Sequence, residues 1–582
     1  MKKRILLTSL FTSLFVSLQA KTVDYQQAAD VAAKAIGTIP PQNGMGVSAV
    51  PENRLTLVKF ASTESNYYVF NEADGNGFVI VSGDDVAKPV LGYSDKGSYD
   101  ENNLPPAFAY WLDFLNREIL YAVQNNFPGN SEWESFSGFR TTEVVVEPLI
   151  KTTWNQTAPY NNLCPEIDGK KTYTGCVATA MAQIMKFHNY PPVGIGQSKA
   201  YISDGGADVP VVDFEELEYD WESMLNYYEY FGTESDIEKN AVATLMYHCG
   251  VAVKMDYGLE FSYAYTTDAA KALVNTFGYD RKILFRDRFF YDNDEWEYML
   301  KEQIDKRLPI MYRAADTENN GHLFICDGYD NMGYFHFNWG WGGNCDGYFT
   351  TTALNPYDEV TFNAEQMIVI NIMPEEGGEP LTDISMWPEK NLTASHTAVD
   401  RRQRFTVTGS FVNFSLFDFK GYIGIALVDN DDQIIEIIGQ QSRSIPSRLG
   451  LDSDRFTVSV SSNVASGNYK IREVAKFTNS SEWTFVRSTS GNTDVLDLTV
   501  KVSVGIAEVS SLKNITVSPN PAENILHISG ENISFAEVTE LSGKVLLSTN
   551  STTINIANLQ SGIYLIVIRT ENGIVTKKMV KR

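Results

Sequence analysis

Residues 174–192 read TGCVATAMAQIMKFHNYPP, and this stretch decides how the longest segment of the chain folds. Its apolar residues Ala180, Ile184 and Phe187 recur at helical spacing, so the stretch predicts a helix that the paired prolines end. Cys176 then lies at or near the first turn, where the helix dipole and free backbone N–H groups favour a thiolate and lower the pKa of the thiol. The same N–H groups can bind a developing oxyanion. A reactive cysteine and a buried structural one fit this segment equally well.

A reactive thiol needs a base, and His322 is the strongest candidate among the six histidines. His188 shares the helix of Cys176 but lies roughly 18 Å further along it, too far to reach the thiol. His322 follows the small residue Gly321 and opens an apolar run, so one face of its ring is expected to be open to a cleft. A lone histidine is more often structural, and the case for His322 depends on a partner.

Asn338 supplies that partner. A turn signal at 330–333 separates it from His322 and predicts that the two runs fold into a hairpin. The Asn338 amide oxygen would accept the ring N–H of His322 and fix the orientation of the imidazole. The Trp-Gly cluster that begins at Trp339 would shield this hydrogen bond from water. A packed aromatic corner is the structural alternative for the cluster, and both roles can hold together.

Composition narrows the class of protein. The 582 residues are too many for one core, and 43% hydrophobic with 21% charged residues is ordinary globular composition. The formal charge of −26 repels phosphate backbones, which argues against a nucleic-acid partner. The five cysteines are odd in number and have no CxxC spacing, which argues against a disulfide framework and a zinc site.

The composition and residue patterns divide the chain into five segments. Residues 1–20 have the basic start and short apolar stretch of a signal peptide. Residues 21–143 mix helical patterns with short β-runs and end in a polar stretch at 128–142 that resembles an exposed linker. Residues 144–375 are the longest mixed α/β stretch. Short alternating strands then predict a β-sandwich at 380–500 and a small all-β unit at 511–582.

Blocks of residues 175–191 resemble the streptopain family, a papain-like group of secreted bacterial cysteine proteases. The runs 255–258, 321–322, 338–343 and 353–356 recur in that family in the same order. The resemblance covers about residues 144–375. It implies that Cys176 is the nucleophile and His322 the base, and that Gln156 donates to the oxyanion beside the Cys176 N–H.

The flanking segments resemble parts of the same kind of precursor. Residues 77–94 are similar to the family's inhibitory propeptide, which implies a zymogen whose propeptide blocks the groove or displaces the histidine, with an activating cut near 128–150. Short blocks between 517 and 564 and the basic end 577–582 resemble the sorting domain of the type IX secretion system. This implies export through Sec and the type IX machinery to the surface or exterior of a Gram-negative bacterium.

We therefore expect a multidomain α+β protein: a papain-like domain with an α+β propeptide, then a β-sandwich and an all-β sorting domain. The expected activity is hydrolysis of protein or peptide bonds through a thioester on Cys176, inhibited by the chain's own propeptide and without a metal or organic cofactor. An apolar residue is expected at the second substrate position. The expected substrate-binding residues are Gly321, Trp339, Trp341 and Ser262. The bulky loop 259–265 departs from the small loop of the family, which puts specificity in doubt.

Three other interpretations stay open. The chain could be a catalytically inactive papain-like binding protein or adhesin of the cell surface, although the full set of Gln, Cys, His and Asn argues against lost activity. The N-terminal segment alone could inhibit a cysteine protease. A transglutaminase would share the cysteine and histidine but usually uses an aspartate to orient the ring.

Overall fold

The computed structural model describes residues 20–36, 54–136, 144–229, 232–315, 321–354, 366–376, 384–488, 492–501, 514–571 and 573–582. It divides into two compact units, Met1–Val500 and Lys501–Arg582. The predicted signal peptide, apart from Ala20, lies outside the described residues, as do positions 355 and 356 of the resemblance.

The N-terminal segment contains helices and strands in the predicted mixture. Its elements are α1 (Tyr25–Ile36), β1 (Leu55–Lys59), β2 (Tyr67–Glu72), β3 (Phe78–Ser82), β4 (Val90–Ser94), α2 (Pro106–Gln124) and α3 (Glu132–Ser135), with 3-10 turns at Ala73–Gly75 and Glu101–Asn103. Part of the predicted linker is folded rather than exposed, because Trp133 of α3 donates its indole N–H to the Ala87 carbonyl at 2.8 Å. Residues 137–142 of that linker lie outside the described chain.

The following segment contains the helix predicted after Gly175. Its elements are β5 (Val144–Val146), β6 (Glu166–Ile167), β7 (Lys170–Lys171), α4 (Cys176–His188), β8 (Tyr201–Ile202), β9 (Asp208–Val209), α5 (Asp236–Ala252), α6 (Thr266–Asn275), β10 (Leu284–Asp287), a 3-10 turn (Arg288–Phe290), α7 (Asn293–Asp305), β11 (Ile310–Ala315), β12 (Gly321–Asp330), β13 (Phe335–Asn338), β14 (Gly347–Phe349) and β15 (Gln366–Ile370). Asn189, in the left-handed conformation, ends α4 just before the two prolines.

One antiparallel sheet of 11 strands runs through both segments, in the order β1-β2-β3-β4-β14-β13-β12-β11-β15-β10, with β5 against β12. The two segments join where β4 pairs with β14, through Tyr93 with Tyr348 and Gly92 with Phe349. A Cβ on Gly92 would lie 2.2 Å from the Phe349 ring, so glycine permits this close approach. The predicted segments 21–143 and 144–375 therefore share one sheet.

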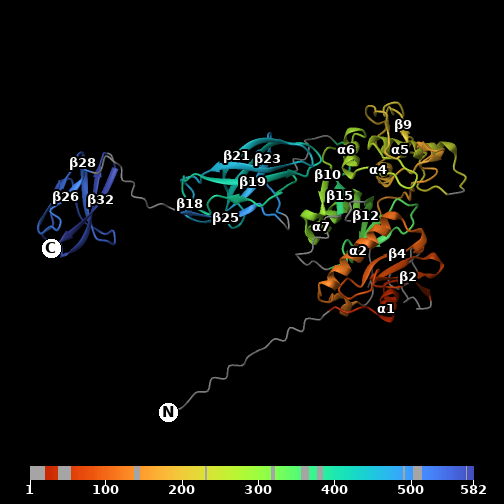
Figure 1. Ribbon diagram of the computed structural model, residues 1–582, viewed down its shortest axis with the longest axis horizontal. Coiled ribbons are helices and arrows are strands. Elements are labelled where there is room, and N and C mark those ends of the chain that lie inside the picture. The colour runs from red at the N-terminus through yellow and green to blue at the C-terminus, as the bar shows by residue number, and fades with distance from the viewer. Residues whose placement is uncertain are drawn as a thin grey trace, which may run out of the picture. The chain divides into compact units, whose positions relative to one another are not determined.

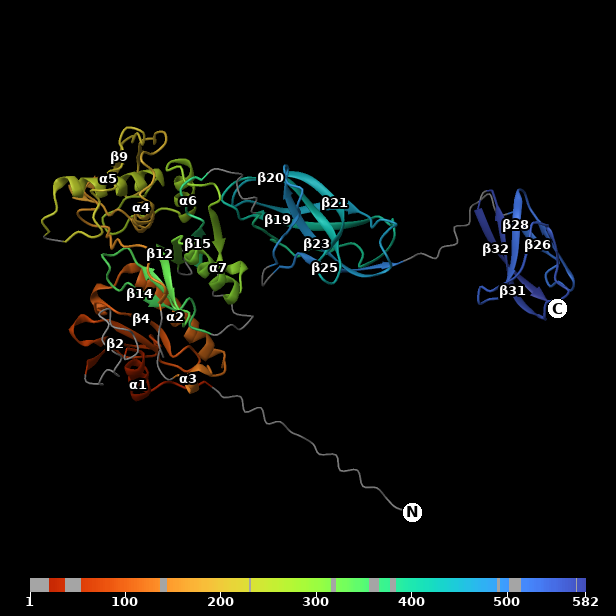
Figure 2. The same ribbon diagram turned by 180° about the vertical axis from the view of Figure 1, so that it is seen from behind.

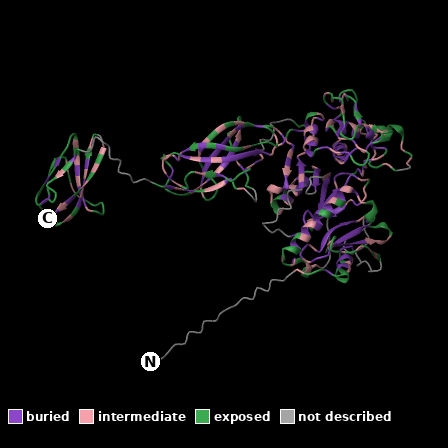
Figure 3. Cartoon of the chain, in the orientation of Figure 1, coloured by how far each residue is buried: buried purple, intermediate pink, exposed green. Residues whose placement is uncertain are grey.

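Two cores cover the two faces of this sheet around β11 and β12, and a third packs α1 against β2, β3 and β4. Helices α4, α5 and α6 bury residues of β11 and β12 on one face. Helices α2 and α7 bury the alternate residues of the same strands on the other face, together with the β3–β4 region. Figure 1 and Figure 2 show α2 beside β12, and Figure 3 shows that the sheet and these helices hold much of the buried part of this region.

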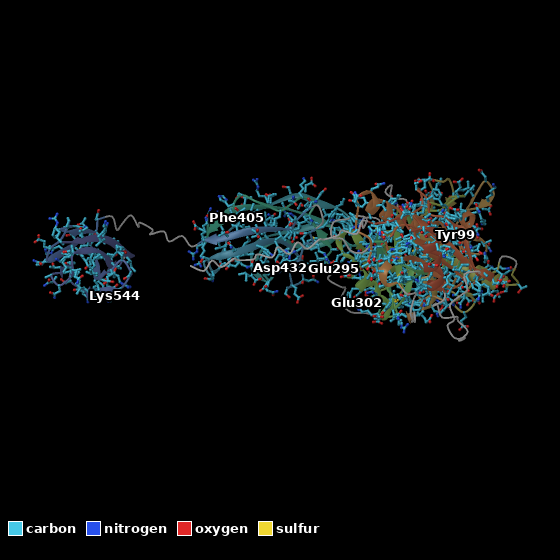
Figure 4. The ribbon with its side chains drawn as sticks, turned by 90° about the horizontal axis from the view of Figure 1, so that it is seen from below. Tyr99, Glu295, Glu302, Phe405, Asp432 and Lys544 are labelled. Carbon is cyan, nitrogen blue, oxygen red and sulfur yellow. The ribbon has the colours of Figure 1, made fainter. Side chains whose placement is uncertain are left out.

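Residues 384–501 form two β-sheets around one core, as the sandwich prediction expects. The strands are β16 (Met386–Trp387), β17 (Thr393–Ala394), β18 (Ala398–Asp400), β19 (Phe405–Asn413), β20 (Phe419–Val428), β21 (Ile434–Ile445), β22 (Gly450–Val458), β23 (Gly467–Phe477), β24 (Thr484–Phe485) and β25 (Val495–Lys501). One sheet contains β16, β17, β19 and β22, and the other contains the remaining six strands. Phe405, labelled in Figure 4, belongs to the shared core.

The second unit is a small all-β body. Its strands are β26 (Thr516–Ser518), β27 (Ile525–Ser529), β28 (Ile533–Thr539), β29 (Val545–Thr549), β30 (Thr553–Asn555), β31 (Gly562–Thr570) and β32 (Gly573–Lys581). They form sheets of three and four strands around their own core. Lys544, labelled in Figure 4, lies in the turn before β29.

Candidate active site

Cys176 begins α4 where that helix meets the start of β12. Gly175 before it has φ of 84°, and a Cβ there would lie 2.8 Å from Met255 Sδ and 3.0 Å from the Ser262 carbonyl oxygen, so glycine is required. Leu323 of β12 donates its backbone N–H to Cys176 Sγ at 3.4 Å. The helix start and the strand start that were predicted to carry the reacting pair therefore lie side by side.

The surroundings of the Cys176 thiol do not favour the thiolate in this form of the chain. Burial raises the pKa of Cys176 above its usual value, although the Leu323 N–H and the charge of Arg313 oppose this. The lowered pKa expected from the helix start is therefore wrong for this form, because loss of water outweighs the helix N–H groups. The thiol is protonated at neutral pH.

His322 is next to Leu323 in β12 and turns the other way. Successive side chains of a strand face opposite sides. Leu323 and Ile325 belong to the α4 core, and Phe324 and Cys326 belong to the α2 core. His322 has the parity of Phe324, so it faces α2 and points away from Cys176.

Helix α2 covers the ring of His322. The ring of Tyr110 in α2 lies 4.9 Å from it, centroid to centroid. Burial and the charge of Arg313 lower the pKa of His322 to about 4, so the imidazole is neutral. Tyr110 lies against the ring, and His322 remains partly exposed. Arg313 occupies the gap beside Gly321, where a Cβ would lie 2.8 Å from its guanidinium carbon.

Asn338 lies on the α4 side of the sheet. The predicted hairpin between β12 and β13 is present, but Asn338 pairs with Ile325 rather than with His322. Its Oδ1 accepts from Gln183 Nε2 at 3.2 Å, and its Nδ2 donates to the Thr152 carbonyl at 2.8 Å. Within the described residues, no hydrogen bond joins His322 to Asn338 or to the Cys176 thiol, so the structure does not bring these three side chains together.

Gln156 lies close to the start of α4. Its carbonyl accepts the Thr174 N–H at 3.2 Å, two residues before Cys176, and its own N–H donates to Asn155 Oδ1 at 2.7 Å. The residue is buried, and its side-chain amide has no hydrogen-bond partner among the described residues. The amide is therefore available to a group that binds next to Cys176.

Two of the predicted substrate-binding residues lie around Tyr173. The Ser262 hydroxyl donates to the Tyr173 carbonyl at 2.8 Å, and Ser262 is buried. The partly exposed Trp341 stacks on the Tyr173 ring with centroids 6.4 Å apart and planes 11° apart. Both side chains therefore lie beside the backbone that leads from Tyr173 to Gly175 and Cys176.

Trp339 belongs to the core that α2 shares with the sheet. It is 1% exposed, and its indole N–H donates to the Cys345 carbonyl at 2.7 Å. The ring of Phe108 in α2 lies 5.3 Å from it. Helix α2 therefore covers Trp339 as well as His322.

Two residues without a predicted role hold this arrangement. Gln183 is fully buried, and its Oε1 accepts from the Thr152 hydroxyl at 2.8 Å and the Trp154 N–H at 3.2 Å. It follows Cys176 by two helical turns, and that spacing places both on one side of α4. The second residue is Tyr110, which contacts His322. Nothing in the sequence around Tyr110 indicates this contact.

The other candidates do not join the site. His188 hydrogen-bonds to the Ile372 carbonyl, and His248 to the Tyr219 hydroxyl. The four remaining cysteines are buried and unpaired: Cys164, Cys249, Cys326 and Cys345. In the described part of the chain, no three His, Cys, Asp or Glu side chains are grouped to hold a metal ion. No helix there has the length and apolar character needed to cross a bilayer.

Comparison with known proteins gives three family matches. Residues 154–349 match the peptidase C10 family, residues 20–119 match the Spi protease inhibitor family, and residues 516–582 match the secretion system C-terminal sorting domain. The sorting domain implies export by a type IX secretion system to the cell surface or exterior.

Individual relatives agree with these matches. Streptopain of Streptococcus pyogenes is 33% identical over 335 residues, which cover 53% of this chain and 81% of streptopain. The thiol protease/hemagglutinin PrtT of Porphyromonas gingivalis is 30% identical over 332 residues, covering 54% of this chain and 38% of that protein.

Among solved structures, a prointerpain A fragment of Prevotella intermedia is 34% identical with a TM-score of 0.47, covering 55% of this chain and 99% of the fragment. Active interpain A of the same species is 38% identical with a TM-score of 0.34, covering 38% of this chain and 93% of interpain A. The chain thus belongs to the peptidase C10 family, as a streptopain-like cysteine protease with a Spi inhibitor propeptide and a C-terminal secretion sorting domain.

Proposed function

We propose that the chain is a secreted endopeptidase made as an inactive zymogen, in which Cys176 and His322 hydrolyse peptide bonds once α2 is displaced. One observation carries the proposal: the Leu323 N–H contacts Cys176 Sγ, while His322, one residue earlier, faces α2. Neighbouring strand residues face opposite sides. Turning over the start of β12 would therefore bring His322 next to Cys176 in place of Leu323. A protonated thiol and a neutral imidazole fit a resting enzyme.

In the active form the reaction is acyl transfer. The proton of the Cys176 thiol passes to His322, and the thiolate adds to the substrate carbonyl carbon. The Cys176 N–H and the Gln156 amide stabilise the oxyanion. His322 then donates its proton to the leaving amine as the C–N bond breaks. Water, deprotonated by His322, finally hydrolyses the thioester and restores the thiol.

Asn338 has the task of orienting His322 after the rearrangement. Its amide is already held on the face of the sheet where Cys176 lies, by Gln183 and the Thr152 carbonyl. In this proposal only the start of β12 moves, and the polar group that receives the ring is in place beforehand. Residues 1–20 direct Sec export, and the type IX machinery carries the protein across the outer membrane of a Gram-negative bacterium.

The test is mass spectrometry of the wild-type chain and a Cys176→Ala variant, each with and without an epoxide alkylator selective for papain-like sites. We expect the wild type to cut itself between residues 128 and 150 and to carry one adduct, on Cys176. Cys176→Ala should show neither change. A Cys249→Ala variant is the matched control, because that thiol is fully buried and burial raises its pKa.

Folded, reduced wild type that shows neither cut nor adduct would contradict the protease mechanism. It would favour the inactive binding protein instead. Adducts on a cysteine other than Cys176 would contradict the assignment of the nucleophile. Amine incorporation in preference to hydrolysis would favour the transglutaminase interpretation.

A further inference from the structure

Two threonine hydroxyls form a short hydrogen-bonded chain inside the first turn of α4. Thr174 and Thr179 are both fully buried, and their Oγ1 atoms lie 3.0 Å apart. The Thr179 hydroxyl also donates to the Gly175 carbonyl at 3.0 Å. A hydroxyl has one proton to donate, so Thr179 accepts its other bond and Thr174 is the donor. The chain therefore runs from Thr174 through Thr179 to the Gly175 carbonyl.

The Gly175 carbonyl accepts two hydrogen bonds from Thr179. The Thr179 N–H donates to it at 3.1 Å, in addition to the hydroxyl. The peptide unit between Gly175 and Cys176 is planar, so its C=O and its N–H point in opposite directions. Holding the carbonyl along α4 therefore directs the Cys176 N–H out of the helix start, where the first N–H groups have no acceptor within the helix.

This peptide unit needs support from its neighbours. Gly175 has φ of 84° and ψ of 146°, a conformation that glycine reaches and other residues rarely adopt. Glycine also has more conformational freedom to lose on folding than any other residue. Contacts from other side chains must therefore fix the orientation of the peptide, and the Thr179 hydroxyl is one of them.

The same chain of hydroxyls reaches Gln156, the second donor to the oxyanion in the proposed mechanism. The Thr174 N–H donates to the Gln156 carbonyl at 3.2 Å. Thr174 thus contacts the backbone of Gln156 and, through Thr179, the peptide unit of Cys176. The two donors to the oxyanion are held relative to each other by this pair of threonines.

The methyl group of Thr179 has a separate contact. A Cβ on Gly340 would lie 3.2 Å from Thr179 Cγ2, so the methyl packs against the turn after Asn338. The Gly340 N–H donates to Asn338 Oδ1 at 3.0 Å. The hydroxyl and the methyl of one side chain therefore face two parts of the site, and a substitution can remove one and keep the other.

We propose that Thr179, with Thr174 as its donor, is a positioning residue whose hydroxyl directs the Cys176 N–H at the carbonyl oxygen of the substrate. The inference rests on the proposed function. The alternative is an ordinary helical threonine that bonds to the carbonyl four residues earlier and contributes only to stability. An oxyanion forms when a nucleophile adds to a carbonyl, so a positioning role predicts a defect in that step alone.

The experiment uses the self-processed full chain and compares two reactions of Cys176. Hydrolysis of a peptide passes through an oxyanion, whereas dithiodipyridine contains no oxygen and modifies the thiol without forming one. Thr179→Val removes the hydroxyl and nearly keeps the shape of the side chain. We expect its kcat for a peptide to fall about 10-fold, the scale of one lost hydrogen bond, with KM unchanged. The rate of thiol modification, corrected for a preparation already alkylated on Cys176, should stay as in the wild type.

Three further variants complete the test, each incubated until processing is complete. Thr179→Ser keeps the hydroxyl and should recover most of the wild-type kcat. Thr174→Val removes the donor to Thr179 and should lower kcat by a smaller factor, and it carries the test if Thr179→Val does not fold. Thr172→Val is the matched control, because that hydroxyl is also fully buried and donates to a backbone carbonyl, that of Pro165 at 2.9 Å. Its kcat should equal that of the wild type.

Three results would overturn the inference. One is a wild-type kcat in Thr179→Val, or in Thr174→Val where that variant carries the test. Another is a parallel loss of peptide hydrolysis and thiol modification, which would show that the hydroxyl only supports the fold around Cys176. The third is a Thr179→Ser variant as slow as Thr179→Val, which would assign the effect to the methyl group against Gly340.

The wild type separates this inference from the proposed function. A wild-type preparation that hydrolyses peptides and reacts at Cys176 has a working mechanism, so an unaffected Thr179→Val rejects only the positioning role. A folded wild type that hydrolyses no peptide rejects the mechanism and the positioning role together.

Discussion

On the α4 face of the β12–β13 hairpin the side chains around Asn338 are polar and hydrogen-bonded, whereas on the α2 face the side chains around Trp339 are aromatic and stacked. The polar face is built from Thr152, Gln183 and Asn338, all within the protease segment. The aromatic face is shared with the propeptide, because Trp111 of α2 contacts the rings of Phe337 and Tyr312. The β12–β13 hairpin therefore has one face built within the protease segment and one face that depends on the propeptide.

This difference teaches how a cysteine protease can be inactive with its polar groups in place. The propeptide does not disturb the network around Asn338. It supplies an aromatic surface that holds His322 on the other side of β12. Perturbations of the two faces should therefore have different consequences, and the effects can be ordered by size. Stability measurements on the uncut chain use a Cys176→Ala background, which prevents self-processing.

The largest effect is expected on the aromatic face. Trp111→Ala removes a fully buried ring between five aromatic side chains and should lower the free energy of unfolding of the uncut chain by about 3–5 kcal/mol. Denaturant unfolding measures this change. Val123→Ala, at an exposed position of the same helix, is the matched control and should have little effect. Equal losses for the two variants would show that α2 does not depend on this contact.

The second largest effect is expected to be a pH dependence of the stability of the uncut chain, which arises on the same face. Burial raises the pKa of Glu118 in α2 to about 7, and its carboxylate accepts from the Ala353 N–H at 2.7 Å and the Thr352 hydroxyl at 3.0 Å. A raised carboxyl pKa favours the protonated form in the folded zymogen. This contribution is therefore complete below the ordinary value of about 4.5 and is lost as the pH rises through 7.

Raising the pKa of Glu118 from 4.5 to about 7 corresponds to roughly 3 kcal/mol across that range. Glu118→Gln should remove this part of the pH dependence, measured as unfolding midpoints between pH 4 and 8. Glu134→Gln on α3, an exposed carboxyl group, should leave the profile as in the wild type. An unchanged profile in Glu118→Gln would contradict the role of this buried carboxyl.

A smaller effect is expected on the polar face. Gln183→Leu leaves the Trp154 N–H without its partner and removes one of two donors to Asn338 Oδ1, which keeps the Gly340 N–H, and should cost about 1–3 kcal/mol. Unlike the Trp111 change, it should also weaken the processed enzyme and lower its kcat, both measured in a chain that keeps Cys176, because Asn338 loses one of the contacts that hold it. Gln124→Leu, an exposed glutamine of α2, is the control. A loss confined to the uncut chain would remove the distinction between the faces.

The smallest effect concerns the contact between Tyr110 and His322. A ring pair of this kind contributes about 0.5–1.5 kcal/mol, so Tyr110→Ala should speed self-processing by roughly 2–10-fold. This variant keeps Cys176, and the rate is followed by gel electrophoresis. Tyr121→Ala, on the same helix but against Phe127, should process at the wild-type rate. An unchanged rate for Tyr110→Ala would mean that other α2 residues hold the histidine.

The sequence was sufficient for the local elements of the site. The helix after Gly175 and the hairpin after Asp330 depend on spacing and turn residues a few positions apart, and both are present. Such local signals do not indicate to which side of β12 the His322 side chain turns. It depends on Tyr110, more than 200 positions earlier, and on which of two successive residues faces Cys176. The predicted pKa of Cys176 was wrong for a related reason. The thiol is buried against β12 only in the folded chain, and local sequence signals do not indicate that burial.

The joint between β4 and β14 has a consequence for the timing of activation. A chain cut between residues 136 and 144 remains one particle, because strand pairing and a common core still hold its two pieces. Departure of the cut piece is a dissociation, so its extent increases on dilution. Export from a confined compartment into open surroundings would itself release the inhibitor. The departing piece leaves β14 as a bare sheet edge, to which a free propeptide can return by adding a strand.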